Sequence, residues 1–307
     1  MARYILKRLL ISLLTLWIMF TLTFFLMHFV PGSPFIGDKK MTPEILANLE
    51  AKHGLDKPLI VQYGLYAKNM LRGDFGESIT LMGQDVKDII IRKFPYSLRL
   101  GLFSSALAII LGTFLGVTSA LKRNSGTDRF IMLIVTIGIA VPSFVIATVS
   151  MIIFGVQLRW LPTISSLDSL TSYLLPGFAL SFFPLSFITR LMRSSMLDVI
   201  NQDYIRTARA KGLSERVVIF KHGLRNGILP IVTYAGPMLA GILTGSFVIE
   251  SIFSIPGLGS SFVTSITARD YPTVMGVTIF FGAFLIFMNF IVDILYRFID
   301  PRINIIK

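Results

Sequence analysis

The sequence predicts an all-α membrane protein with six transmembrane helices. Hydrophobic residues occupy 53% of its 307 positions and charged residues only 15%, a composition that excludes an ordinary soluble domain. Runs of about twenty apolar residues recur, each long enough to cross a hydrocarbon layer of about 30 Å as a helix. We place the six spans at approximately residues 9–30, 101–121, 130–156, 173–191, 231–249 and 274–296.

The first apolar run follows Arg3, Lys7 and Arg8, a basic flank that is also typical of a signal peptide. The run continues to Val30 without a small-x-small cleavage motif. We therefore interpret residues 1–30 as a retained first transmembrane helix.

Residues 31–98 are the longest stretch between spans and are predicted to form a small extracytoplasmic cap. The segment is long enough to be translocated regardless of its charge, and its nine basic and eight acidic residues nearly cancel. Thr42 as N-cap, Pro43 at the first helical position and Gly54 just past the end predict a helix. The sequence GDFG at 73–76 indicates a turn.

The remaining residues, 99–307, are predicted to form a five-helix core. Pro142, Pro184 and Pro237 fall inside predicted spans, where proline is expected to kink the helix or mark irregular backbone. Such kinks suit a translocation path, but they also occur in static bundles.

Two glycine pairs, Gly112 with Gly116 and Gly241 with Gly245, place small residues on one face of a helix. Such pairs allow two helix backbones to approach closely. Ordinary helix packing is the simpler interpretation of this common motif, and a mobile gate contact is the alternative.

The formal charge of +12 is distributed very unevenly along the chain. With the N-terminus placed in the cytoplasm, the cytoplasmic segments hold seventeen of the 29 lysines and arginines, whereas the two short outer loops hold only Arg159 and Arg269. This asymmetry follows the positive-inside rule. We therefore expect both termini in the cytoplasm, a lipid bilayer around the spans, and no nucleic-acid partner.

Motifs for catalysis or ligand binding are missing from the sequence. It has no cysteine, no GxxxxGK[ST] phosphate loop and no HExxH motif, and its three histidines lie at positions 28, 53 and 222. The span interiors lack the ionisable residues that ion-coupled carriers need. We expect no catalytic residue, no metal and no cofactor on this chain, and no transport driven by an ion.

Residues 203–230 are the most informative segment, a polar and strongly basic stretch between apolar spans that we call the basic loop. Its pattern predicts two short helices. Asp203 is the expected N-cap of the first helix, Gly212 takes the left-handed position that ends it, and Ser214 is the expected N-cap of the second.

The two helices combine an apolar stripe with basic side chains, and Leu213 is placed to pack against Val218 as a hydrophobic staple. The stripe consists of Ile205, Ala208, Val217 and Phe220. The basic side chains are those of Arg206, Arg209, Lys211, Arg216, Lys221 and Arg225. Such a surface suits docking on another protein or binding to anionic lipid, and spacing alone leaves both open.

Within the basic loop, Arg206-Thr207-Ala208, Gly212 and the later Leu229-Pro230 resemble the EAA loop of ABC-importer permease subunits. Two features depart from the common form: Arg206 and Thr207 replace its Glu and first Ala, and the spacing from Gly212 to Leu229 is longer. Both match the peptide/nickel branch of the family. The resemblance implies that the loop forms a coupling helix seated in a groove of a cytoplasmic ATPase.

Other motifs extend the resemblance to the B-type permease of that branch over nearly the whole chain. They are VPGSP at 30–34, GLDKP at 54–58, QY at 62–63, GDFGES at 73–78, VPSF at 141–144, WLP at 160–162, FSIPGLG at 253–259, RDYP at 269–272 and DPR at 300–302. The resemblance implies a type I ABC-importer permease fold in the bacterial cytoplasmic membrane.

The partners implied by the resemblance are a homologous C-type permease, two P-loop ATPase subunits and an extracytoplasmic peptide-binding protein. The translocation path would run between the two permeases. ATP and magnesium are expected on the ATPases, so this chain would be a non-catalytic subunit.

The implied function is that of a permease subunit in an ATP-driven importer of oligopeptides. Dipeptide, nickel or other small-solute importers of the same branch are alternatives, and a stand-alone channel or carrier, or a structural or signalling anchor, is the alternative from another class. Substrate-binding residues are not identifiable from the sequence.

Closure of the ATPases is expected to pull the basic loop and swing the attached spans from inward-open to outward-open. Gly212 would set the angle between the two segments, and Ala208 would be the small contact that lets the helix sit close to the ATPase. The residues expected to couple are Tyr204, Ile205, Arg206, Ala208, Arg209, Lys211, Gly212, Leu213, Ser214, Glu215, Val217 and Val218.

Overall fold

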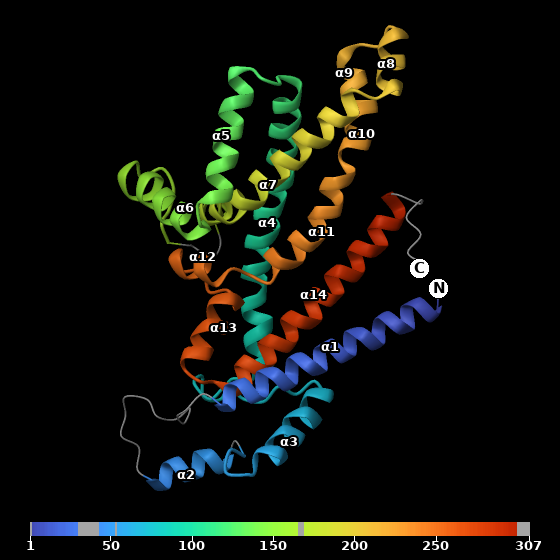
Figure 1. The fold of residues 1–307 in the computed structure, drawn as a ribbon. Helices are drawn as coiled ribbons and strands as arrows, with labels where there is room; N and C mark the ends of the chain where they lie inside the picture. Colours follow the sequence, from blue (N-terminus) through green and yellow to red (C-terminus); the bar gives the residue numbers. More distant parts are fainter. Residues whose placement is uncertain (1, 30–42, 53, 165–168, 300–307) are drawn as a thin grey trace. The chain divides into compact units, whose positions relative to one another are not determined.

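The computed structural model describes residues 2–29, 43–52, 54–164 and 169–299 (Figure 1). Every regular element in this described part is helical, and the β-type pairing there is an isolated antiparallel bridge between Glu77 and Asp85. The predicted all-α class is confirmed. Backbone contacts divide the chain into two compact units, one from residues 1–96 and 256–287 and the other from residues 97–255 and 288–305.

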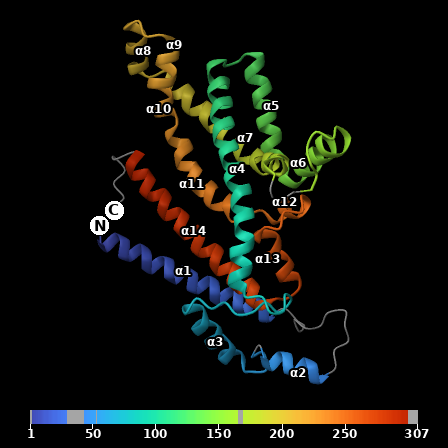
Figure 2. The ribbon, with the colours of Figure 1, turned by 180° about the vertical axis from the view of Figure 1, so that it is seen from behind.

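The first unit is held together by aromatic packing between helices that are distant in sequence. It contains α1 (Ala2–Phe29), α2 (Pro43–Lys52), α3 (Leu59–Leu71), α13 (Leu258–Thr267), the first turns of α4 (Val86–Leu121) and most of α14 (Tyr271–Ile299). Phe20 and Phe24 of α1 are buried against Ala67 of α3 and Met275 of α14. Figures 1 and 2 show α1 and α14 side by side in this unit.

Local predictions for the segment between the first two spans are confirmed. Helix α2 begins at Pro43, and Gly54 adopts a φ of +67°. Thr42, the predicted N-cap, lies outside the described residues. At the predicted turn, Gly76 has a φ of +81° and its backbone N–H donates to Asp74 Oδ1 at 2.9 Å.

A buried carboxylate, Asp270, fastens the loop that follows α3 to the start of α14. Asp270 is 1% exposed and accepts hydrogen bonds from the hydroxyls of Ser78, Thr80 and Thr273 and from the backbone N–H of Ile79. The Thr80 and Thr273 bonds measure 2.7 and 2.8 Å. Because a buried charge is costly unless donors surround it, this set of contacts fixes the loop in place.

The second unit is organised around α7, which packs against α5, α6 and α11. The unit contains the rest of α4, α5 (Gly126–Ala140), α6 (Ser143–Ser150), the π-helical η1 (Met151–Gln157), the 3-10 helix η2 (Leu170–Tyr173), α7 (Leu174–Ile200), α8 (Asp203–Ala210), α9 (Glu215–Val217), the π-helical η3 (Val218–Gly223), α10 (Leu224–Gly227), α11 (Leu229–Leu243) and α12 (Phe247–Ile252). The core of the second unit is formed by Ile188, Met192 and Met196 of α7 together with Ile231 and Met238 of α11.

The first glycine pair brings α4 into close contact with α7. A Cβ atom at Gly112 would lie 2.8 Å from Ile188, and one at Gly116 would lie 2.5 Å from Met192. Real Cβ atoms essentially never approach so closely, so the packing interpretation of this pair is confirmed. The second pair differs, because Gly241 has open space around it and Gly245 lies beyond the end of α11 with a φ of +93°.

The predicted spans correspond to four single helices and two bent helix pairs in the described residues. Helices α1, α4, α7 together with η2, and α14 are each long and apolar enough to cross a membrane. Helix α5 and the segment of α6 with η1 form a pair bent by 111°, and residues 215–227 form a pair with α11 bent by 50°. With each pair counted as one span, which in the second pair is carried by α11, the described residues contain up to six spans by length and composition.

The prolines and the end of α11 show where the predicted spans needed correction. Pro142 lies at the break between α5 and α6, as expected for a proline that interrupts a helix. Pro184 and Pro237 lie inside α7 and α11 without ending them. The span predicted at 231–249 ends early, because α11 stops at Leu243 and a turn leads into the short α12.

Candidate coupling surface

The first helix of the basic loop, α8, rests on its own chain. Ile205 and Ala208 are only 1% and 6% exposed, and they pack with Val218 of η3 and Val199 of α7. Residues three apart lie on the same face of a helix, so this face of α8 is closed by intrachain contacts. The small side chain of Ala208 is therefore used to bring α8 close to its own neighbours.

The turn that ends α8 has the geometry predicted for Gly212. Gly212 adopts a φ of +74°. Its backbone N–H donates to the carbonyl of Arg209 at 2.9 Å, and the N–H of Leu213 donates to the carbonyl of Ala208 at 3.4 Å. These two bonds form a Schellman motif, which satisfies carbonyl groups at a helix C-terminus. The motif sets the direction in which the chain enters α9.

An ion pair bridges the Gly212 turn. Arg209 Nε donates to Glu215 Oε1 at 2.7 Å, and Arg209 Nη2 donates to Oε2 at 3.3 Å. The hydrogen bond to Glu215 raises the pKa of the Arg209 guanidinium. Both side chains are exposed, so solvent screens the attraction, and the pair orients α8 and α9 more than it stabilises them.

The outward surface of the basic loop combines apolar and basic side chains. The helices α8, α9 and α10 that belong to this loop are labelled in Figure 1. The exposed apolar side chains are those of Tyr204, Leu213, Val217 and Phe220. The exposed basic side chains are those of Arg206, Arg209, Lys211, Arg216, Lys221 and Arg225. Phe220 is 62% exposed. Apolar side chains with a polar rim are the usual make-up of a protein-docking site, and we call this set the basic-loop surface.

Of the twelve residues predicted to couple, nine are exposed, and Ile205, Ala208 and Val218 are buried in this chain. The spacing of apolar residues in a sequence does not reveal whether a helix face packs on a partner protein or on its own chain. Ala208 packs inside the loop, and its direct contact with an ATPase stays a prediction.

Details of the caps also differ from expectation. Asp203 is the first residue of α8, and Gln202 takes the N-cap position. Ser214 does occupy the N-cap position of α9, although its side chain makes no capping hydrogen bond. Leu213 does not form the expected staple, because it is 39% exposed and the cluster around Val218 is formed by α8 and α7.

A buried ion pair ties α5 to α7. Asp128 is 4% exposed. Arg193 Nε and Nη2 each donate to one of its carboxylate oxygens at 2.8 Å, and Ser119 and the backbone N–H of Asn124 also donate to it. The pattern Ser125-x-x-Asp128 is a signal for a helix start, but it does not reveal a partner 65 residues away.

Glu250 is a further buried acid, after Asp270 and Asp128, whose partner was not predictable from the sequence. Glu250 is 0% exposed, and its Oε1 accepts a hydrogen bond from Ser97 Oγ at 2.7 Å. A Cβ atom at Gly245 would lie 2.6 Å from the same oxygen. Glu250 lies on α12, beyond the end of α11.

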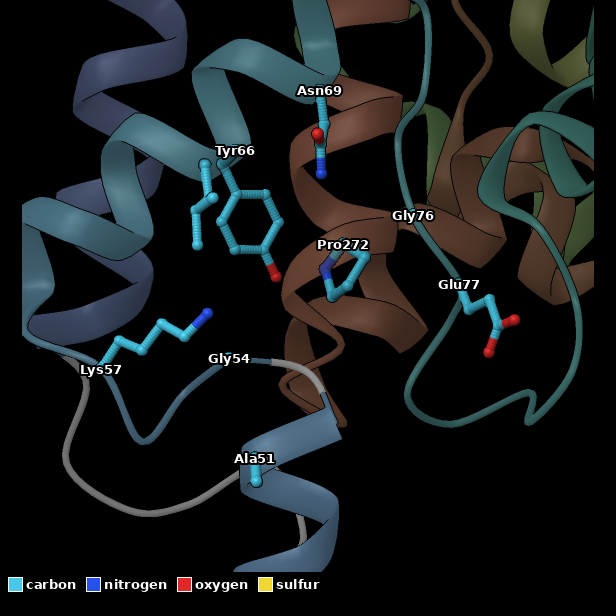
Figure 3. Close-up of a pocket in the computed structure, with 9 residues that line it drawn as sticks. Ala51, Gly54, Lys57, Tyr66, Asn69, Gly76, Glu77 and Pro272 are labelled. Atoms are coloured by element: carbon cyan, nitrogen blue, oxygen red, sulfur yellow. The ribbon is translucent and has the colours of Figure 1, made fainter.

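The first unit contains a cavity of about 400 Å³ (Figure 3). Lys57, Tyr66, Asn69, Gly76 and Pro272 are among the residues that line it. Burial raises the pKa of Tyr66, and the nearby charge of Asp270 acts in the same direction, so its phenol stays protonated. Among the described residues, no group of three or more His, Asp and Glu side chains could hold a metal ion.

Comparison with known proteins places the chain in a family. Residues 108–305 match the family described as the binding-protein-dependent transport system inner membrane component, and residues 1–101 match the N-terminal component of such systems. The chain belongs to this family. The boundary between the two matches lies close to residue 97, where the second compact unit begins.

Relatives cover the permease from end to end. The oligopeptide transport system permease protein OppB of Haemophilus influenzae is 45% identical over 305 residues, covering 99% of this chain and 100% of that protein. The dipeptide transport system permease protein DppB of Bacillus subtilis is 46% identical over 307 residues, covering 100% and 99%. The OppB of Escherichia coli K12 is 43% identical over 305 residues, covering 99% and 100%.

Solved structures share the fold of the permease. An inward-facing structure of the MetNI methionine ABC transporter matches with a TM-score of 0.56 and 17% identity, covering 69% of this chain and 96% of that chain. An amino acid ABC transporter matches with a TM-score of 0.54 and 13% identity, covering 69% and 94%. The predicted type I ABC-importer permease fold is confirmed, and the chain is a multi-pass membrane component of a transport system.

Proposed function

We propose that this permease forms half of the translocation path of an ATP-driven importer of oligopeptides, together with a homologous C-type permease. The observation that carries the proposal is the basic-loop surface, an exposed apolar and basic surface on the segment that joins α7 to α11. Such a surface suits docking on a separate motor protein. The full-length similarity to permeases named for peptide transport supports this choice.

The permease is oriented with the basic loop and both termini in the cytoplasm. The support is the charge asymmetry of the sequence, because seventeen of the 29 lysines and arginines then lie on the cytoplasmic side. In this orientation residues 31–98 form an extracytoplasmic cap, and the cavity beside Lys57 and Tyr66 opens on the outer side.

Force applied to the basic-loop surface would pass into the spans through buried contacts. Ile205 and Ala208 of α8 pack on Val199 of α7, and Ser195 Oγ of α7 donates to the carbonyl of Gly227 at 2.8 Å. Because α8 and α10 are both fastened to α7, closure of two docked ATPases would move α7 with them. Helix α11, which begins at Leu229 directly after α10, would be carried along.

The permease would take no chemical part in ATP hydrolysis. ATP and magnesium would be held by the two P-loop ATPase subunits, and an extracytoplasmic peptide-binding protein would deliver the solute to the outer side. The sequence of this chain has no phosphate-binding loop, which supports the assignment of nucleotide binding to other subunits.

Oligopeptides are the proposed solute, and dipeptides, nickel and other small solutes are the alternatives. The oligopeptide and dipeptide permeases compared above are 45% and 46% identical to this chain, so similarity does not separate these two. A path that accepts peptides of varied sequence is consistent with both.

The proposal is tested by affinity purification of this permease from its native membrane in mild detergent, followed by mass spectrometry. We expect to recover a second six-span permease, one or two kinds of P-loop ATPase and a peptide-binding protein, whose bound ligand then identifies the solute. A Phe220→Asp variant, which places a charge on the basic-loop surface, should lose the ATPases. The matched variant Met82→Asp, at an exposed apolar position outside the spans, alters no part of that surface and should keep them. Recovery of the wild-type chain alone, from a membrane that contains the ATPases, would contradict the proposal.

A further inference from the structure

One face of α7 stays open in the second unit and carries aromatic and polar side chains. Phe183 and Phe187 are 47% and 37% exposed, and Arg190 and Ser194 are also exposed. These four positions are three or four residues apart, so they share one face of the helix. The opposite face of α7 is buried in the core with Ile188 and the neighbouring methionines.

Helix α11 continues this open face. Thr233, Pro237 and Gly241, which are four residues apart, are all exposed. Tyr234, beside Thr233, contacts Phe187 of α7 with ring centroids 4.4 Å apart. Because this contact joins the two helices at their open sides, α7 and α11 present one continuous surface, which we call the α7/α11 face.

The α7/α11 face carries an exposed arginine and hydroxyl groups, whereas the exposed face of α1 is mainly aliphatic. The large exposed side chains of α1 include Leu9, Leu10, Leu13, Leu14, Ile18 and Leu22. Hydrocarbon chains favour such aliphatic surfaces, whereas an arginine within a span faces protein or a water-filled cavity, and one near the end of a span can also reach the membrane surface. The α7/α11 face therefore has the composition of a surface that lines a water-filled path, with an arginine, hydroxyl groups, a proline and a glycine.

We propose that the α7/α11 face is the wall of the translocation path and binds the peptide in transit. Phe183, Phe187 and Tyr234 would contact its side chains and backbone, and Arg190 would attract its terminal carboxylate. Aromatic rings bury a large apolar area at each contact and lose little side-chain entropy, which suits peptides of varied sequence. Arginine binds carboxylates through two parallel hydrogen bonds.

This inference rests on the proposed function and identifies the residues that would contact the peptide. The basic loop connects α7 to α11 directly, so a movement of that loop acts first on the two helices that form the wall. Opening and closing of the wall would then follow the state of the docked motor. The same link explains why the binding face and the coupling surface belong to one stretch of chain, from α7 to α11.

The first arm of the test uses thiol labelling, because the chain has no cysteine. Phe183→Cys, Phe187→Cys and Gly241→Cys are introduced singly into the transporter purified with its partner subunits and reconstituted in liposomes. A small charged methanethiosulfonate reagent is expected to modify all three positions, and transported peptide is expected to slow the reaction. Phe114→Cys on α4, a position that is 65% exposed on an aliphatic face, should stay unmodified.

The second arm measures peptide uptake at saturating loaded binding protein. Arg190→Gln is expected to lower the maximal rate about tenfold for peptides with a free carboxylate, a loss equivalent to one charged hydrogen-bonded contact. C-terminally amidated peptides should be affected much less, and Arg190→Lys should keep most of the rate. Phe187→Ala should lower the rate for both kinds of peptide, whereas Phe114→Ala should not.

Two results would overturn the inference. If the cysteines at positions 183 and 187 are not modified by the charged reagent, the face lies against lipid or against the second permease. Equal losses for free and amidated peptides in Arg190→Gln would remove the carboxylate contact. Absence of any peptide uptake by the wild-type transporter would instead overturn the proposed function, while the labelling arm would still report whether this face lines a water path.

Discussion

Gly212 shows how one backbone angle controls the shape of the basic loop. Its φ of +74° is unfavourable for any residue with a Cβ atom, yet no atom lies within 4 Å of the Cβ position. The effect of a substitution therefore comes from the backbone alone, at about 1–2 kcal/mol, with β-branched residues affected most.

We predict a graded response to substitution of Gly212. Gly212→Ala should reduce peptide-stimulated ATPase activity of the assembled transporter, and Gly212→Val should abolish it, because the Schellman turn no longer aims α9 correctly. Gly126→Ala, at a position that also has open space but no positive φ, is the matched control and should behave as wild type. Normal coupling in Gly212→Val would show that the turn geometry is not required.

Asp270 gives a second prediction at the scale of one residue. Asp270→Asn keeps the size of the side chain but offers one acceptor oxygen and an amide group to a set of hydroxyl and N–H donors. Leaving buried donors unsatisfied should cost about 1–3 kcal/mol. We expect a lower thermal midpoint and faster proteolytic cleavage in the loop 76–85, with Asp56→Asn on the surface as control. Identical cleavage patterns in the two variants would contradict the role given to Asp270.

At the scale of helices, the contact of α4 with α7 depends on two positions without a side chain. Gly116→Ala would place a methyl group 2.5 Å from Met192 and 2.7 Å from the carbonyl of Thr189, an overpacking that typically costs about 1–3 kcal/mol. The thermal midpoint of the purified transporter should fall. Gly64→Ala on α3, where nothing lies within 4 Å, should leave it unchanged or raise it slightly. Equal midpoints for the two variants would show that α4 can move away from α7.

The helices themselves were largely predictable because their causes are local. Length and apolar composition located the spans, Pro142 predicted the break between α5 and α6, and Gly212 predicted the turn in the basic loop. The 111° angle at that break was not predictable, since it depends on how α5 and α6 each pack on α7. The early end of α11 likewise depends on a turn at Gly245 that fits against Glu250.

Contacts between distant residues explain most of what the sequence did not reveal. Ser78 and Asp270 are separated by 192 positions, and Asp128 and Arg193 by 65, so no local pattern marks either pair. Ala208 illustrates the opposite difficulty. The sequence predicts its place in an apolar stripe. Only the fold shows that the stripe is divided, with Ile205 and Ala208 facing inward and Val217 and Phe220 facing outward.

At the scale of the whole molecule, the two proposed tasks, docking on the motor and contact with the peptide, both belong to the second compact unit. The first unit contains the segment 31–98, the cavity and the Asp270 contacts, and the second contains the basic-loop surface and the α7/α11 face. Residues proposed to meet the motor and residues proposed to meet the peptide therefore belong to the same unit. This arrangement lets a movement of the docking segment act on the path without passing through another unit.

The central claim is that the basic-loop surface docks on a cytoplasmic ATPase, and crosslinking tests it most directly. Because the chain has no cysteine, Phe220→Cys can carry a single thiol-attached photocrosslinker in the assembled transporter. Lys122→Cys, on the exposed turn between α4 and α5, is the control for proximity. We predict that the probe at 220 attaches this permease to an ATPase subunit and that the probe at 122 does so far less. A probe at 220 that labels only lipid, or equal ATPase labelling from both positions, would contradict the claim.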